Sequence, residues 1–547
     1  MAALGLASTI TAQFFAAKAS VGFATELRQA VYDHVQHLSY TELDTLGTDT
    51  LITRLTDDVN QIQNGLNMGL RLLLRSPFIV LGSMVMAFTI DFKCALVFAV
   101  AIPFLFLVVF VIMFLSIPLF KKVQGKLDTV TGLTRENLTG VRVIRAFCRE
   151  KEAVAEFDTR NQELTKLNLF VGKLSALLNP VTYVLINIAT VILIQKAGVE
   201  VNLGGMQQGQ VVALYNYMAQ MIVELIKLAS LIITLNKSAA CAGRVADILK
   251  VKSTMDYPAA TTVSCSDSAQ TPKDLIAATA DTSLSENAIV FNDVTFEYSK
   301  AGAPSLSHIS FSVKKGQTVG IIGGTGSGKT TLVNLISRFY DASKGTVLLD
   351  GQNIENYTRS DLRSRIGVVP QKAALFKGSI RDNLKWGRED ASDEDLWQAL
   401  TTAQGKEVVE GKPGQLDFML EQNGKNLSGG QKQRLTIARA LVKKPEILIL
   451  DDSASALDFA TDAALRKSLN RLDWKVTTFL VSQRSSSIQQ ADLILVLDNG
   501  TLAGKGTHAE LLRTCDTYRE IYFSQFPEER ARYSSVSAGN IMKEVTV

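Results

Sequence analysis

Residues 318–337 read TVGIIGGTGSGKTTLVNLIS, and this stretch decides the fold of the C-terminal half. Thr318–Ile322 is an apolar run typical of a buried strand, and Thr331–Ser337 has a helical pattern. The glycine-rich segment between them is therefore a strand–loop–helix connection. Glycines let successive backbone N–H groups turn toward one point at the N-terminus of a helix, where the helix dipole favours anions.

The pattern GxxxxGKT in this setting predicts a P-loop that holds the phosphates of ATP. Lys329 would supply a positive charge for the β and γ phosphates, and Thr330 would offer its hydroxyl to Mg²⁺. The predicted phosphate-binding residues are Gly323, Gly324, Thr325, Gly326, Ser327, Gly328, Lys329, Thr330 and Thr331.

Two further motifs follow the P-loop. Residues 447–451 read ILILD, a short apolar strand whose final carboxylate, Asp451, is the expected second contact to Mg²⁺. Residues 427–431 read LSGGQ and open a predicted helix over Lys432–Val442. We expect Ser428 to cap that helix and leave two glycine amides facing outward.

Together these motifs resemble the nucleotide-binding domain of ABC transporters, from Ile289 to about Phe526. The resemblance implies that two such domains enclose two ATP molecules, each between the P-loop of one chain and the LSGGQ of the other. It assigns nucleotide contacts to Ser428, Gly429, Gly430 and Gln431.

The same resemblance implies roles for four more residues. Tyr298 matches the aromatic residue that stacks on adenine, and Gln371 matches the glutamine that touches Mg²⁺. Asp458 matches a residue of the loop that lies across the dimer from the other chain. Glu421 matches a residue of the loop that contacts the membrane helices. Ordinary packing of Tyr298 and plain surface charge at Glu421 are the alternatives.

Two positions depart from the hydrolytic pattern of this family. Asp452 stands where a glutamate is expected as general base, and Gln483 stands where a histidine is expected. One methylene fewer withdraws the carboxylate by roughly 1.5 Å, and a misplacement of about 1 Å can cost on the order of 10²-fold in rate. Gln483 can donate a hydrogen bond to a phosphate but has no positive form.

This pair of changes resembles the degenerate-site subunit of heterodimeric bacterial multidrug-type ABC exporters. The ATP site with Asp452 and Gln483 at its catalytic positions would then be weakly hydrolytic, and a different partner chain would carry the more active site. The alternative is that the residue at each of the two positions changed independently, without a shared functional cause.

The first 245 residues contain long apolar runs, in a chain of 547 residues that is 47% hydrophobic. A bilayer core requires about 20 apolar residues in a helix. Five spans are predicted, near residues 1–24, 77–90, 94–120, 169–194 and 211–235. The exporter fold has six, so we expect its first helix to be missing from this sequence. A signal peptide is the alternative for residues 1–24, but no basic region precedes them.

Several details of the membrane half are also predicted. Asp91–Lys93 should turn one helical hairpin, and a glycine-rich link over Gly198–Gly209 should join the last two spans. Charged helical segments over Glu26–Gln63 and Glu136–Leu167 should extend beyond the bilayer, the second with Ile144, Phe147, Val154 and Phe157 on one face. Glu224 and Lys227, at mid-membrane, indicate either a substrate or gating role or a pair that stabilises the helix.

The predicted architecture is thus an α-helical transmembrane domain of ABC exporter type (1–245), a linker (246–288), an α/β P-loop nucleotide-binding domain with a helical subdomain (289–526), and a tail (527–547). The segment Val251–Glu286 shows no periodic spacing of apolar residues and is expected to be mobile. The predicted location is the cell membrane, with the nucleotide-binding domain in the cytoplasm.

The predicted function is outward transport of a small hydrophobic or amphipathic compound, driven by ATP and Mg²⁺, together with a second half-exporter chain in a lipid bilayer. A regulatory or receptor-like subunit without transport, and an exporter of lipid or peptide, are the alternatives. The net charge of +4 is too small to indicate nucleic-acid binding. The five cysteines and four histidines are scattered, which predicts neither a disulfide framework nor a metal site.

Overall fold

The computed structural model describes residues 2–73, 75–258, 286–298 and 302–530. The chain divides into two compact units. The helical unit comprises Met1–Gln36 and Thr48–Val251, and the α/β unit comprises His37–Gly47 and Lys252–Val547. Most of the linker predicted to be mobile, and most of the tail, lie outside the described residues.

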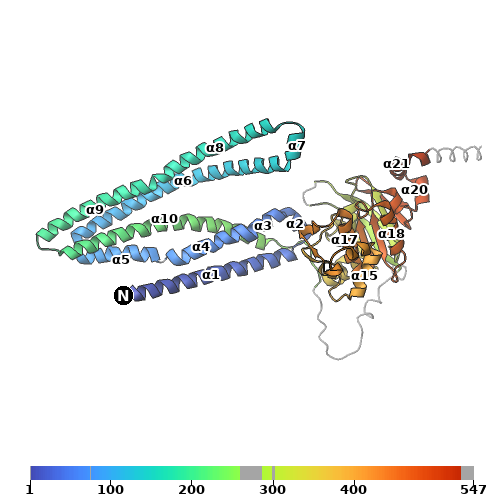
Figure 1. Cartoon of the computed structure of the whole chain (residues 1–547), viewed down its shortest axis with the longest axis horizontal. Helices are drawn as coiled ribbons and strands as arrows, with labels where there is room; N and C mark the ends of the chain where they lie inside the picture. The colour runs from blue at the N-terminus through green and yellow to red at the C-terminus, as the bar shows by residue number, and fades with distance from the viewer. Residues whose placement is uncertain (1, 74, 259–285, 299–301, 531–547) are drawn as a thin grey trace, which may run out of the picture. The chain divides into compact units, whose positions relative to one another are not determined.

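Long helices build the helical unit, and α4, α5, α6, α8, α9 and α10 run side by side (Figure 1). Its elements are α1 (Ala2–His37), α3 (Thr48–Thr53), the π-helix η1 (Arg54–Asp58), α4 (Val59–Leu72), α5 (Arg75–Ile90), α6 (Phe92–Thr139), α7 (Val141–Ala146), α8 (Glu150–Ala176), α9 (Leu178–Asn202) and α10 (Gln208–Lys250).

Four helical stretches among the described residues are long and apolar enough to cross a membrane: Thr48–Ile90, Phe92–Thr139, Glu150–Asn202 and Gln208–Lys250. Helix α1, which holds the fifth predicted span, is 36 residues long but is not one of the four. Helix α6 has 48 residues, about 72 Å at 1.5 Å per residue, against a hydrocarbon core of about 30 Å. It is therefore long enough to extend far outside the bilayer.

The predicted hairpin at residue 91 is confirmed. Helix α5 ends at Ile90, and Asp91 caps α6 by accepting a hydrogen bond of 2.7 Å from the backbone N–H of Cys94. The glycine-rich link is shorter than predicted, because α9 continues to Asn202 and α10 begins at Gln208.

The two charged segments are interrupted, contrary to the prediction of long continuous helices. The first breaks before α2 (Tyr40–Leu46) and again at Gly47, whose φ of 76° is left-handed. The second breaks at Gly140 and after α7, where Cys148 has a φ of 54°. The predicted apolar face therefore does not form, and Phe147 and Val154 are 74% and 66% exposed.

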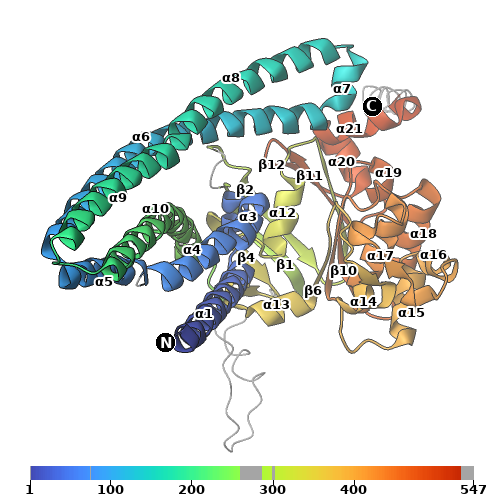
Figure 2. The same ribbon diagram turned by 60° about the vertical axis from the view of Figure 1, so that its left-hand side comes forward.

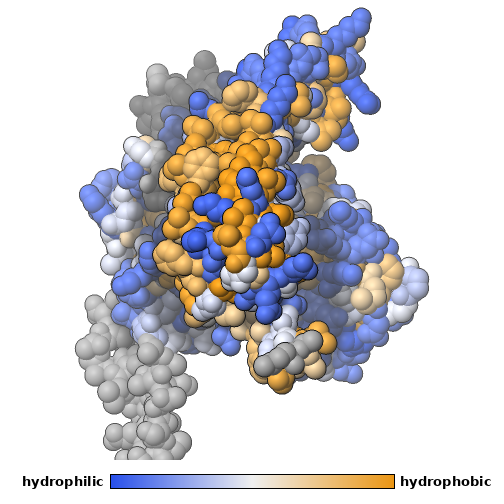
Figure 3. All heavy atoms as spheres, turned by 90° about the vertical axis from the view of Figure 1, so that its left-hand side faces the viewer, coloured by the Kyte–Doolittle hydropathy of each residue, from blue (hydrophilic) through white to orange (hydrophobic). Residues whose placement is uncertain are grey.

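A core of apolar side chains joins α5, α6, α9 and α10, with Phe98, Leu193 and Leu214 fully buried. Many outward-facing side chains of these helices are apolar too, as expected for surfaces that meet lipid. Figure 3 shows one end of this unit, where hydrophobic residues cover much of the face and hydrophilic residues lie among them.

One buried carboxylate connects two of these helices. Glu224 of α10 accepts hydrogen bonds from the Ser76 hydroxyl of α5 at 2.7 Å and from the Lys227 amine at 2.8 Å. Both carboxylate oxygens are thus engaged. These contacts favour the stabilising role, and a gating or substrate role stays a prediction.

The α/β unit contains three sheets. A six-stranded sheet has the order β12-β11-β3-β10-β9-β6, parallel except for the β11–β12 pair. An antiparallel sheet has the order β2-β1-β4-β5, and β7 pairs with β8. The strands are β1 (Asn287–Phe296), β2 (Leu306–Lys314), β3 (Thr318–Gly323), β4 (Lys344–Leu349), β5 (Gln352–Asn353), β6 (Ile366–Val369), β7 (Gly378–Ser379), β8 (Met419–Leu420), β9 (Ile447–Asp451), β10 (Thr477–Val481), β11 (Leu493–Asp498) and β12 (Thr501–Gly506).

Helices cover both faces of the six-stranded sheet (Figure 2). One core lies between this sheet, α12 and the antiparallel sheet, and a second lies under α14–α18, the predicted helical subdomain. The helices are α2 (Tyr40–Leu46), α12 (Lys329–Ile336), α13 (Arg359–Arg365), α14 (Ile380–Lys385), α15 (Asp393–Thr402), α16 (Lys406–Glu410), α17 (Gly429–Val442), α18 (Phe459–Leu469), α19 (Ser485–Ile488), α20 (His508–Thr514) and α21 (Asp516–Gln525).

Candidate functional site

The predicted P-loop joins β3 to α12 in the strand–loop–helix order that the sequence requires. At two of its positions only glycine leaves room for the neighbouring backbone carbonyl oxygens. A Cβ on Gly323 would lie 2.2 Å from the carbonyl oxygen of Leu497. Gly328 caps α12 at a φ of 95°, and a Cβ there would lie 2.9 Å from the carbonyl oxygen of Ser305. Any other residue at either position would displace backbone and distort the loop.

Lys329 lies inside this loop and is 9% exposed. Its amine donates hydrogen bonds to the carbonyl oxygens of Gly323 and Gly324, at 3.0 and 2.6 Å. Burial lowers the pKa of this amine, although the carboxylates of Asp452 and Asp451 act in the opposite direction. The loop therefore holds the Lys329 amine beside its own carbonyls and near these two acids.

Asp451 ends β9 beneath the same loop. It is 6% exposed, and its carboxylate accepts a hydrogen bond of 3.3 Å from the Thr330 hydroxyl. Burial raises the pKa of Asp451, and the adjacent Asp452 raises it further. A buried carboxylate beside a hydroxyl is a pair of hard oxygen ligands, the kind that Mg²⁺ prefers.

A pocket of about 450 Å³ extends from Tyr298 to the P-loop. Tyr298, Gly326, Gly328, Lys329, Thr330 and Thr331, all predicted to bind nucleotide, line it together. Sequence reasoning missed four other lining residues, Pro304, Ser305, Asn499 and Gly500. The dipeptide Asn499-Gly500 is a recognisable turn signal, but nothing in it indicates proximity to the P-loop.

Tyr298 is partly buried at one end of this pocket. Its hydroxyl lies 3.2 Å from the Thr331 hydroxyl, and its ring meets the Tyr340 ring edge-on at 5.2 Å between centroids. The Tyr340 hydroxyl donates a hydrogen bond of 2.6 Å to Asp44 of α2. Tyr298, the predicted adenine-stacking residue, is therefore connected to Asp44 of α2 through one intervening side chain, that of Tyr340. Sequence reasoning did not find this connection.

Asp452 and Gln371 lie beside the anchoring residues. The Gln371 side-chain amide donates a hydrogen bond of 3.3 Å to the Asp452 carboxylate. Asp452 has a left-handed φ of 44°, and burial raises its pKa. Gln483 follows β10 with an exposed side chain, and its backbone carbonyl accepts a hydrogen bond from Gln525 at 2.8 Å.

Ser428, Gly429, Gly430 and Gln431 begin α17 but do not line the nucleotide pocket of their own chain. Ser428 caps α17, as predicted, because its hydroxyl accepts from the Gln431 N–H at 3.4 Å and its own N–H donates to the Gln431 side chain at 3.1 Å. Ser428 and Gly429 are exposed. These groups are therefore available to a second molecule.

Asp458 and Glu421, also given roles by resemblance, are exposed. Asp458 caps α18 by accepting from the Thr461 N–H and hydroxyl at 2.8 and 2.9 Å, and these bonds lower its pKa. Glu421 donates its backbone N–H to Asn426 at 3.2 Å. The roles of both side chains toward a partner or the membrane helices stay predictions.

Comparison with known proteins agrees with this geometry. Residues 1–225 match the ABC transporter transmembrane region, and residues 306–455 match the ABC transporter family. An uncharacterized ABC transporter ATP-binding protein of Mycobacterium tuberculosis is 35% identical over 519 residues, which is 94% of this chain and 86% of that protein. The chain belongs to the ABC transporter family.

Two further similarities refine this result. A probable multidrug resistance ABC transporter ATP-binding/permease protein of Bacillus subtilis is 33% identical over 502 residues, covering 91% of this ABC transporter chain and 82% of that protein. The solved structure of a bacterial Atm1-family ABC exporter with ATP bound superposes with a TM-score of 0.76 at 24% identity, over 93% of this chain and 86% of that one. The fold is that of an ABC exporter, placed in a membrane with its nucleotide-binding domain in the cytoplasm.

Proposed function

We propose that this chain is the ATP-binding and permease subunit of a heterodimeric exporter, and that its own ATP site binds nucleotide more readily than it hydrolyses it. The observation that carries the proposal is the pair Asp452 and Gln483, found where the family pattern has glutamate and histidine. The anchoring residues Lys329, Thr330 and Asp451 are all present and lie together.

The pocket fits ATP and Mg²⁺. Tyr298 at one end offers a ring for adenine, and Lys329 at the other offers a cation for phosphate. Thr330 and Asp451, with Gln371 next to Asp452, offer oxygen ligands for Mg²⁺. When bound, Mg²⁺ withdraws charge from the phosphate oxygens and so favours attack by water.

Asp452 is the residue that would take a proton from the attacking water. A general base must come within about 2.6–3.2 Å of that water, and an aspartate reaches roughly 1.5 Å less far than a glutamate. The Gln371 amide also occupies one acceptor position of the Asp452 carboxylate. Gln483 would hydrogen-bond the phosphate without adding charge.

A second chain would complete each site. Ser428 and Gly429 are exposed at the N-terminus of α17, where free backbone N–H groups and the helix dipole favour phosphate. They would serve ATP held by the P-loop of the partner. We therefore place the faster hydrolysis at a site made from the partner's P-loop and this chain's LSGGQ, with outward transport of a hydrophobic or amphipathic compound coupled to it.

The test is ATP turnover in lipid nanodiscs. The chain is purified alone and also with a half-exporter that carries glutamate and histidine at the two positions. We expect little phosphate release from the chain alone and robust release from the pair. Comparable rates in both preparations would refute the heterodimer. Slow turnover in both, without transport into vesicles, would favour a regulatory subunit instead.

A further inference from the structure

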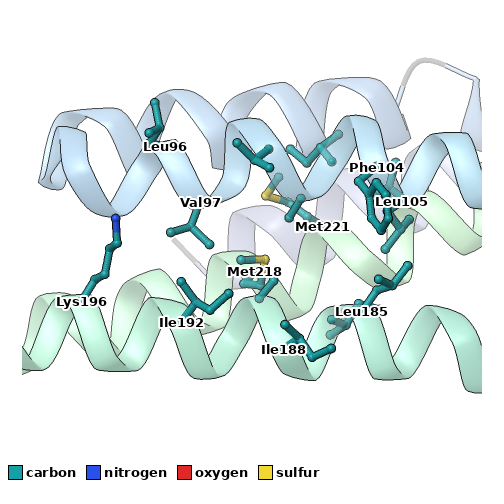
Figure 4. A pocket seen from close by; sticks show the side chains of 16 residues that line it. Leu96, Val97, Phe104, Leu105, Leu185, Ile188, Ile192, Lys196, Met218 and Met221 are labelled. Carbon is teal, nitrogen blue, oxygen red and sulfur yellow. The ribbon is translucent and has the colours of Figure 1, made fainter.

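A second pocket, of about 350 Å³, lies within the helical unit between α6, α9 and α10 (Figure 4). Its lining is apolar with one exception. Leu96 and Phe104 come from α6, Ile188 comes from α9, and Met218 and Met221 come from α10. Methionine side chains adapt to ligands of varied shape, as at other promiscuous binding surfaces.

The exception is Lys196 of α9, the one charged side chain among the described residues that line this pocket. Figure 4 shows its side chain extending from α9 toward α6 at one end of the pocket, with the apolar side chains along the rest. Helix α9 ends at Asn202, and α10 runs back from Gln208 to Lys250, the end from which the chain continues to the nucleotide-binding domain. Lys196 therefore lies toward the outer end of the helix, where a long basic side chain reaches the interface.

The acidic residues around Lys196 have other partners. Glu200, one turn further along α9, forms an ion pair of 2.8 Å with Lys93. Asp91 caps α6 through the N–H of Cys94. Lys196 forms no ion pair among the residues that the structure describes. The pocket thus combines a long apolar wall with one positive charge that forms no ion pair among the described residues.

We propose that this pocket binds a single-chain anionic amphiphile, such as a fatty acid, with its head group at Lys196 and its alkyl chain along α6, α9 and α10. The proposal rests on the transport function proposed above and names the class of its substrate. A volume of about 350 Å³ is near the lower end of the roughly 300–1,000 Å³ of ligand sites, which favours one alkyl chain over the two of a phospholipid. An amine at the same position would meet a like charge.

The probe is palmitate carrying a photoreactive diazirine near the end of its chain, added to the whole protein in phosphatidylcholine nanodiscs. Cross-linked peptides are identified by mass spectrometry. Palmitate, hexadecanol, hexadecylamine and phosphatidylglycerol compete at equal mole fraction in the bilayer, so that partitioning into lipid is the same in each arm. We expect labelling of α6, α9 and α10, and competition by palmitate roughly tenfold stronger than by the alcohol or the amine.

Four variants make the test specific. Lys196→Gln should reduce labelling of these helices roughly tenfold, whereas Lys196→Arg should retain it. Lys173→Gln, which removes an exposed charge outside the pocket, is the matched control and should label as the wild type does. Ala101→Phe keeps the charge but fills the apolar lining, and it should block labelling.

Equal competition by hexadecanol, or undiminished labelling of Lys196→Gln, would overturn the proposal. Phosphatidylglycerol competing as well as palmitate would also overturn it, because the pocket would then hold ordinary membrane lipid. The readout needs no ATP turnover. Failure of the heterodimer proposal therefore appears only in phosphate release, and failure of this one appears only in the labelling.

Discussion

The two sides of the predicted nucleotide site, one that anchors the phosphates and one that would react, are held very differently. On the anchoring side, Lys329 and Asp451 are buried: the Lys329 amine donates to two backbone carbonyls at 3.0 and 2.6 Å, and Asp451 accepts one hydrogen bond of 3.3 Å from Thr330. On the reacting side, the Asp452 carboxylate has one hydrogen bond within the described part of the chain, from Gln371 at 3.3 Å, and the Gln483 side chain is exposed. Buried groups with fixed partners are already in position to bind, whereas exposed groups need further contacts to become ordered.

This contrast separates binding from chemistry within one site. The anchoring side needs only residues of its own chain, since β3, β9 and α12 place every group. The reacting side lacks the expected glutamate and histidine, and in the proposed heterodimer the LSGGQ that would close it belongs to the partner chain. Variants of the LSGGQ, of the anchoring side and of the reacting side should therefore differ in the size of their effects.

The largest effect is expected from Gly430→Glu in the heterodimer. The new carboxylate would repel the γ-phosphate at the partner's site, and loss of one such phosphate donor costs on the order of 10²–10³-fold in rate. A Cβ at Gly430 also lies 3.0 Å from the carbonyl oxygen of Ala456, so the fold must be checked by thermal melting. Ser428→Ala, which keeps the backbone, should give a smaller loss of phosphate release. Wild-type turnover by both folded variants would contradict the assignment of LSGGQ to the partner's ATP.

Lys329→Ala should weaken nucleotide binding by this chain roughly 10- to 100-fold, because hydrogen bonds to charged groups contribute about 1.5–3 kcal/mol each. Binding of a fluorescent ATP analogue to the chain alone measures this. Lys315→Ala is the control, since Lys315 is an exposed lysine paired with Asp350 at 3.1 Å outside the pocket. In the heterodimer, turnover by Lys329→Ala should lie between that of Gly430→Glu and that of Asp452→Asn. Unchanged affinity for the analogue would mean that the P-loop does not anchor nucleotide here.

The anchoring side was predictable because its motifs are local. A strand, a glycine-rich turn and a helix must follow one another for the loop to form, and 318–337 does so. The cap at Ser428 is predictable for the same reason, since the capping group and the capped N–H lie three residues apart. Contacts between residues a few positions apart can therefore be predicted from the sequence alone.

Long-range contacts were not predictable in this way. Asp44 and Tyr340 are joined by a hydrogen bond across 296 positions of sequence, and no local pattern marks either residue. The break before α2 did carry a signal, because Ser39 and Glu42 form a capping box that the reading of one long helix overlooked. The break after α7 carried none, since Cys148 adopts its left-handed conformation without a glycine.

Repairing the reacting side should speed hydrolysis at this chain's own site. Asp452→Glu with Gln483→His restores the reach of the base and a side chain that can carry charge. We expect roughly a tenfold faster loss of bound ATP, below the 10²-fold that a misplacement of about 1 Å can cost, because the left-handed backbone at Asp452 is unchanged. Single-turnover decay of trapped ATP is the measurement, and each single variant is the control. No change in the double variant would place the limiting defect in the partner's LSGGQ.

The smallest effect is expected from Asp452→Asn in the heterodimer. If Asp452 does little chemistry, removing its charge should change steady-state phosphate release by no more than about threefold, well below the 10²-fold or more that general acid–base groups usually contribute. The amide has nearly the same shape, so it can still meet Gln371, and the anchoring side keeps Lys329, Thr330 and Asp451. The same variant should bind the fluorescent ATP analogue at least as well as the wild type, because one negative charge near the phosphates is gone. Loss of turnover comparable to that of Gly430→Glu would mean that this subunit hydrolyses ATP itself, and that the contrast between the two sides of its pocket does not divide binding from catalysis.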